Sequence, residues 1–81
     1  TLMSFGQTDP LLEAARKKLE AKDYKGARID ASKVIDAAPK NKLAYVLRGR
    51  ARMGLQDDYG AISDFTFALD IDSLFAEALN H

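Results

Sequence analysis

Cysteine and tryptophan are absent from the sequence, and its one histidine is the last residue, His81. The lack of cysteine excludes disulfide bonds and thiolate metal ligands. One terminal histidine provides neither a Ser–His–Asp arrangement nor a histidine cluster for a metal ion. The phosphate-binding pattern GxxxxGK is missing as well. We therefore expect a protein that is not an enzyme, with no metal site and no cofactor.

Long apolar runs and a signal peptide are also missing. No apolar stretch approaches the roughly 20 residues that a membrane-spanning helix needs, and the opening TLMSFG does not have the pattern of a signal peptide. With 81 residues, of which 47% are apolar and 30% charged, the chain has the composition of one small globular domain. We expect residues 1–7 to be a linker or an expression remnant, residues 8–81 to form the domain, and the location to be cytoplasmic.

Lysine and arginine are absent after Arg52, although the whole chain is neutral. All 12 basic residues lie between Arg16 and Arg52, so residues 1–52 have a net charge of +6 (12 basic and 6 acidic) and residues 53–81 one of −6 (6 acidic). Two interpretations stay open: the halves pack side by side and neutralise each other, or the asymmetry marks an interaction surface. Nucleic acid is not an expected partner, because phosphate binding needs an excess of positive charge, and arginines at i and i+2, as in RGRAR, do not share one helix face.

Helical spacing of the apolar residues and capping signals together predict five helices. No stretch sustains the period of two that is typical of a strand. The first helix is expected to begin at the N-cap Asp9, with Pro10 in its first turn, and to stop near Lys22. The other four are expected to follow the caps Asp23, Asn41, Asp57 or Asp58, and Ser73, the last of them forming a short C-terminal capping helix at residues 74–80.

An internal repeat with a period of 34 residues accompanies these helices. The repeated pairs are Arg16 and Arg50, Asp23 and Asp57, Gly26 and Gly60, Ala27 and Ala61, Asp30 and Asp64, and Asp36 and Asp70. A fixed offset over this many positions predicts two units with the same helix–turn–helix structure. Small residues are expected to let the two helices of each unit approach closely, through the contacts Ala15–Ala27 and Gly49–Ala61.

The 34-residue unit resembles the tetratricopeptide repeat. In residues 42–75 the matching positions are Tyr45, Gly49, Ala61 and Phe65, and Ser73 stands where the family usually has proline. In residues 8–41 they are Leu11, Ala15, Ala27, Ala31 and Pro39, with Leu11 and Ala31 in place of aromatic residues. The resemblance implies an all-α, right-handed solenoid of two units and about five helices, closed by the C-terminal capping helix.

The same resemblance implies a non-catalytic protein-interaction module, in which the first helices of successive units line a concave groove for a peptide or a partner protein. The positions of this groove are Leu12, Arg16, Leu19, Leu43, Val46, Arg50 and Met53. Its arginines and apolar residues favour a ligand with acidic and apolar residues. The alternative that a neighbouring repeat or the N-terminal segment covers the apolar side chains stays open. As an alternative, the chain is a self-associating stacking module of a longer repeat array, since its oppositely charged halves favour head-to-tail contact.

Arg48 falls on the inner side of its predicted helix, where an isolated charge is costly. We expect Arg48 to be partly buried and to pair with Asp64 or Asp30, because a shared guanidinium satisfies both groups. A ligand-binding role for Arg48 is the alternative.

Overall fold

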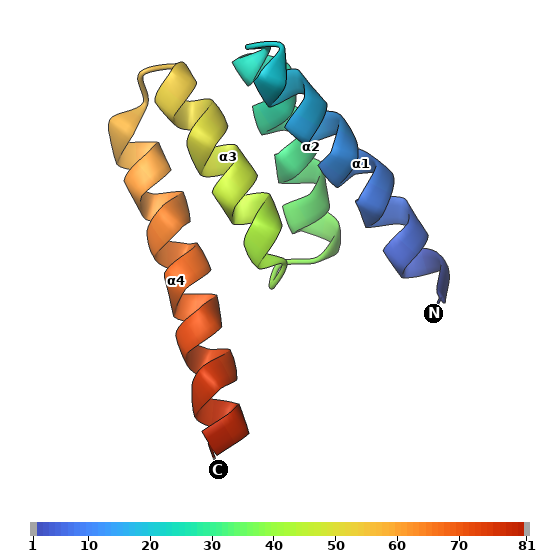
Figure 1. Cartoon of the computed structure of the whole chain (residues 1–81), viewed down its shortest axis with the longest axis vertical. Helices are drawn as coiled ribbons and strands as arrows, with labels where there is room; N and C mark the ends of the chain where they lie inside the picture. Colours follow the sequence, from blue (N-terminus) through green and yellow to red (C-terminus); the bar gives the residue numbers. More distant parts are fainter. Residues whose placement is uncertain (1, 81) are drawn as a thin grey trace.

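Four helices make up the part of the chain that the structure describes. The computed structural model gives the backbone of residues 2–80 and the side chains of residues 10–71. The helices are α1 (Leu2–Glu20), α2 (Tyr24–Ala37), α3 (Lys42–Gly54) and α4 (Asp58–Asn80). They lie side by side in the order of the sequence, each packed against the next, and α1 also touches α3 (Figure 1). The all-α prediction is confirmed.

The prediction of a separate fifth helix is wrong, because α4 continues through Ser73 to Asn80. Ser73 is therefore not an N-cap, and residues 74–80 belong to α4. Serine inside a helix costs only about 0.5 kcal/mol relative to alanine, whereas a proline at the same place removes a hydrogen bond and clashes with the preceding turn. No glycine or proline follows Gly60 in the sequence, so α4 meets no residue that breaks a helix.

The predicted start of the first helix is wrong as well. The helix α1 begins at Leu2, so Asp9 is not its N-cap and Pro10 lies inside it rather than in its first turn. Proline forfeits its own N–H bond and disfavours the helical conformation of the residue before it, which weakens a helix but does not forbid one. The division of the chain into residues 1–7 and 8–81 stays a prediction.

The three predicted caps in the middle of the chain are confirmed. The side chains of Asp23 and Asp57 each accept a hydrogen bond of 3.1 Å from the backbone N–H three residues on, that of Gly26 and of Gly60. Asn41 does the same for α3, at 3.2 Å from the backbone nitrogen of Ala44. Each bond satisfies a donor in the first turn that has no partner within its own helix.

The turns after α1 and after α3 are equivalent, bond for bond, at the 34-residue offset. Lys22 and Gln56 both take the left-handed conformation, with φ of 64° and 65°. Two hydrogen bonds from backbone N–H to backbone C=O then close each turn. In the first turn Lys22 donates to Leu19 at 3.0 Å and Asp23 donates to Lys18 at 2.8 Å. In the second turn Gln56 donates to Met53 and Asp57 donates to Arg52, at the same two distances. This is the Schellman arrangement, in which the left-handed position is usually glycine. The residue after it is the N-cap of the next helix, so the reversal is short and rigid.

Glycine at these left-handed positions is expected to stabilise the fold. A residue with a side chain is strained in the left-handed region, and glycine is not. Glycine also increases the conformational entropy of the unfolded chain, which offsets part of this gain. On balance Lys22→Gly and Gln56→Gly should each raise the free energy of unfolding by about 0.5–1 kcal/mol. Urea denaturation followed by circular dichroism measures the change. Lys33→Gly, inside α2, is the control and should lower the free energy of unfolding by about 1 kcal/mol. Destabilisation by all three glycines contradicts the argument.

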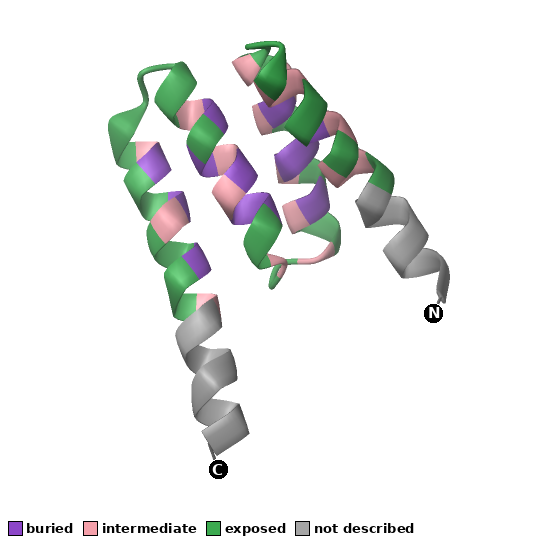
Figure 2. Ribbon diagram, viewed as in Figure 1, coloured by how far each residue is buried: buried purple, intermediate pink, exposed green. Residues whose placement is uncertain are grey.

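The core consists mainly of alanine. In Figure 2 the purple, buried segments lie on the sides of the helices that are turned toward a neighbouring helix. The buried apolar residues of the described part are Ala15, Ala27, Ala31, Val34, Ala44, Tyr45, Leu47, Ala51, Ala61 and Ala68. Small side chains bring helix backbones close together, which suits Gly49: a β-carbon there would lie 2.7 Å from the Phe65 ring. All four residues of the predicted contacts Ala15–Ala27 and Gly49–Ala61 are buried, while the contacts themselves stay a prediction.

Candidate functional site

The most buried charge in the described part of the chain is the carboxylate of Asp64 on α4. Arg48 donates two hydrogen bonds to this carboxylate, from Nε to Oδ2 at 2.9 Å and from Nη2 to Oδ1 at 2.8 Å. Arg52 donates a third, from Nη1 to Oδ2 at 3.0 Å. The predicted pairing of a partly buried Arg48 with Asp64 is confirmed, since the side chains of Arg48 and Asp64 are 19% and 2% exposed. The hydrogen bond to Asp64 raises the pKa of Arg48, against burial, which lowers it.

The first unit has a simpler version of this cluster. Asp30 pairs with Lys18 at 2.7 Å, and these two residues stand 34 positions before Asp64 and Arg52. The place of Arg48 is taken by Ala14, so the first unit has one cation on its buried carboxylate and the second has two. The sequence argument missed Lys18 and Arg52, although their 34-residue offset matches that of their partners. The carboxylates of both clusters are thus paired with cations of the chain itself, which favours a structural role for the clusters.

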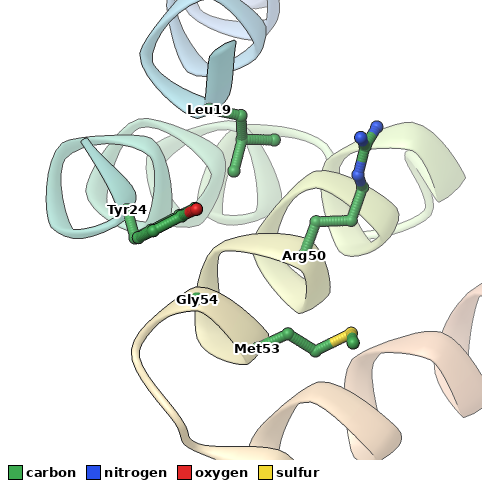
Figure 3. A pocket seen from close by; sticks show the side chains of 5 residues that line it. All are labelled: Leu19, Tyr24, Arg50, Met53 and Gly54. Atoms are coloured by element: carbon green, nitrogen blue, oxygen red, sulfur yellow. The ribbon is translucent and has the colours of Figure 1, made fainter. Parts of the chain in front are cut away.

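A groove runs between α1 and α3. It consists of two adjoining hollows that share Leu19 and Arg50, one between α1 and α3 and one that reaches the start of α2 (Figure 3). We call this surface the α1–α3 groove; its lining residues are Arg16, Leu19, Glu20, Tyr24, Arg50, Met53 and Gly54. Figure 3 shows that Leu19, Tyr24 and Met53 come from three different helices, so the groove depends on how these helices pack.

The structure brings together four of the predicted groove residues, Arg16, Leu19, Arg50 and Met53, around this groove. The other three lie elsewhere. Leu12 packs on the buried cluster of Ala15, Ala31 and Leu47. Val46 lines a separate hollow between α3 and α4, and Leu43 is 50% exposed and lines neither hollow of the groove.

Tyr24 and Gly54 were missed by the sequence argument. A β-carbon at position 54 would collide with the ring of Tyr24, so glycine allows the ring to lie against the end of α3. An aromatic residue just after one helix cap and a glycine at the end of the following helix were the available signals. Together they close one side of the groove with a flat aromatic surface, on which apolar or cationic groups pack well.

The two arginines of the groove differ in their surroundings. Arg16 is held within its own helix by Glu13 and by Glu20, whose Oε1 lies 2.9 Å from Nη1. The hydrogen bond with Glu13 raises the pKa of Arg16, as do the negative charges of Glu13 and Glu20, and the hydrogen bond to Arg16 lowers the pKa of Glu13. Arg50 is exposed and has no ion pair or hydrogen bond with any described residue. Only Arg50 therefore offers an unpaired positive charge to a ligand.

Within residues 10–71, no group of three or more His, Cys, Asp or Glu side chains lies close enough together to hold a metal ion. None of the helices, over the residues that the structure describes, is both long enough and apolar enough to cross a membrane. The chain matches no family model, and no curated protein or solved structure is significantly similar to it. The resemblance to the tetratricopeptide repeat thus stays a hypothesis that depends on the chain's own residues.

Proposed function

We propose that this chain is a non-catalytic protein-interaction module that binds a peptide segment of a partner protein in the α1–α3 groove. The observation that carries the proposal is the combination of one unpaired arginine, Arg50, with the apolar side chains of Leu19 and Met53 and the ring of Tyr24 on the same concave surface. A cation surrounded by apolar surface suits a ligand with a carboxylate next to apolar residues.

The proposal includes the architecture implied by the resemblance, a right-handed solenoid of tetratricopeptide-like units. Its support is the recurrence of structural detail at 34 residues. The N-cap bonds of Asp23 and Asp57, the left-handed turns at Lys22 and Gln56, and the buried carboxylates all recur at this offset. Repeated units of this kind stack so that equivalent helices form one continuous concave face. The helices α1 and α3 are the equivalent pair here, and the groove lies between them.

The structure sharpens the ligand prediction by separating Arg50 from Arg16. The carboxylates of Glu13 and Glu20 already neutralise Arg16, and a ligand has to compete with both of them. Arg50 has no such competitor among the described residues. An acidic residue of the ligand is therefore expected to pair with Arg50, while its apolar neighbours cover Leu19 and Met53.

The test is selection of peptides from a random display library on the whole chain, followed by affinity measurement. The selected sequences should combine an acidic with an apolar residue. Arg50→Glu should weaken their binding about tenfold or more, which corresponds to loss of one charge pair of about 1.4 kcal/mol. Arg16→Met should weaken their binding less than Arg50→Glu does, because Arg16 is already paired with Glu13 and Glu20.

Lys33→Glu is the matched control for this series. It reverses an exposed charge on α2, outside the groove, and should leave the affinity unchanged. Selected peptides without acidic residues, or equal effects of Arg50→Glu and Lys33→Glu, count against the proposed function. The side chain of Arg50 is exposed, so Arg50→Glu should not affect the fold. Circular dichroism of the variant checks that it remains folded.

A further inference from the structure

The seat of α3 on the first helix pair shows what kind of helix this fold accepts. Leu47 of α3 is 3% exposed and forms one buried cluster with Ala15 of α1 and Ala31 of α2. Ala44 and Ala51, three residues before and four after Leu47, are fully buried and share its face of the helix. The seat thus takes a helix that presents a leucine between two small residues.

The same seat recurs, empty, on the second helix pair. In the occupied seat Leu12 and Ala31 pack around Leu47, and Val34 and Ile35 follow Ala31 on α2; 34 residues on, these four positions are Val46, Phe65, Ala68 and Leu69. These four, together with Lys42, line a hollow between α3 and α4. Ile35 is half-buried, whereas its counterpart Leu69 is 66% exposed, and no described helix covers this hollow. We call this surface the α3–α4 seat.

The charges at the seat recur as well. In the occupied seat, Nη1 of Arg48 of α3 lies 3.4 Å from Ser32 Oγ of α2, and Asp36 stands one helical turn further along α2. The counterparts of Ser32 and Asp36 are Thr66 and Asp70. Both are exposed, and Asp70 has no ion-pair partner among the described residues. A basic residue on an incoming helix, placed like Arg48, therefore meets an unpaired carboxylate.

A second copy of the chain does not present a matching helix in head-to-tail stacking. The positions of α1 equivalent to Ala44, Leu47 and Ala51 are Pro10, Glu13 and Lys17. All three are exposed, and two are charged. Burying Glu13 and Lys17 against an apolar hollow costs free energy that the contact does not return. This face of α1 is polar, so a second copy stacked head to tail does not fill the seat.

We propose that the α3–α4 seat is a second protein-binding site, separate from the α1–α3 groove, and that it takes an amphipathic helix of a partner protein with the pattern Ala-x-x-Leu-Arg-x-x-Ala. The leucine enters the hollow formed by Val46, Phe65 and Leu69. The small residues let the two backbones approach, and the arginine pairs with Asp70. Such a helix takes the position on the second helix pair that α3 takes on the first.

A synthetic peptide with the sequence of α3 and its cap, NKLAYVLRGRARMG, is the probe. Titrated into the whole isotope-labelled chain, it should shift the NMR signals of Val46, Phe65, Ala68 and Leu69. Leu69→Lys in the chain should weaken binding about fivefold or more, because it places a charge in the hollow. Tyr59→Lys is the control on the same helix, since Tyr59 is 90% exposed and lies outside the hollow. The affinity of this variant for the peptide should equal that of the unchanged chain. Asp in place of Leu47 in the peptide should abolish binding.

Three outcomes overturn the proposal. The first is the absence of shifts at millimolar peptide, and the second is shifts centred on Leu19 and Met53 or on the occupied seat at Ala15 and Ala31. The third is a dimer of the chain alone, in sedimentation, that Leu69→Lys dissociates, because the occupant is then a second copy. The Arg50→Glu variant separates the two sites: it should bind this peptide normally even where it loses peptides of the groove.

Discussion

Replacing Arg48 with methionine is expected to lower the free energy of unfolding by about 3 kcal/mol, since removal of one partner from a buried ion pair leaves the other charge poorly compensated. Asp64 is only 2% exposed and loses two of its three side-chain hydrogen bonds in this variant. Arg52 retains the third, which keeps the effect at the lower end of the range for buried pairs. For a domain of this size the melting temperature should fall by about 12–24 °C.

Two further variants make this prediction specific to the pairing. Arg50→Met removes an exposed arginine from the same helix and should change the free energy of unfolding by less than about 0.5 kcal/mol. The double variant Arg48→Met, Asp64→Leu removes both charges and should recover most of the loss, because no buried carboxylate is then left without partners. Urea denaturation measures all three. Equal stabilities of the Arg48→Met and Arg50→Met variants contradict this account of the cluster.

Ala61→Leu is expected to destabilise the fold by about 1–3 kcal/mol, because the extra carbon atoms overfill a tightly packed contact. Ala61 is 1% exposed, on the helix that packs against α3, and Gly49 of α3 is buried with no space for a β-carbon beside Phe65. Leucine favours a helix nearly as well as alanine, so the loss reports packing and not helix propensity.

The matched control is Ile62→Leu at the next position. Ile62 is 61% exposed, so this change alters the surface of α4 without touching its packed face. Its effect on the free energy of unfolding should be within about 0.5 kcal/mol. Equal free energies of unfolding of the Ala61→Leu and Ile62→Leu variants contradict this prediction, because the stability of the fold then does not depend on close approach of α3 and α4.

The sequence predicted best those features that depend on near neighbours in the chain. The caps Asp23, Asn41 and Asp57 bond to backbone groups three residues away, so residue type and spacing suffice to identify them. Arg48 was predicted correctly for a related reason: helical spacing places it on the inner side, and a buried arginine requires an acidic partner. The two candidate partners, Asp30 and Asp64, lie in the helices that precede and follow that of Arg48.

The ends of the outer helices could not be predicted in the same way. Asp9-Pro10 and Ser73 have the residue types of helix starts, but each is also compatible with a helix that continues through it. Which of the two states forms depends on the free energy of the whole helix, and a local signal of about 1 kcal/mol does not decide it. The α3–α4 seat was missed because its recognition needs the contacts of Leu47 in the occupied seat.

The composition of the groove was predicted in part. Leu19, Arg50 and Met53 line the hollows where α1 and α3 meet, as their shared helical face leads one to expect. It does not show that Val46 turns toward α4, because that depends on the rotation of α3 about its own axis. The difference between Arg16 and Arg50 was available from the sequence: Glu13 and Glu20 stand three and four residues from Arg16, the spacing at which helical side chains pair.

The structure of the whole chain in complex with its best selected peptide, determined by crystallography or by NMR with intermolecular distance restraints, tests the proposed function most directly. The account predicts that a carboxylate of the peptide lies within ion-pair distance of the Arg50 guanidinium, with apolar peptide side chains on Leu19 and Met53. A peptide bound elsewhere on the chain, with Arg50 still exposed to solvent and the groove empty, contradicts it.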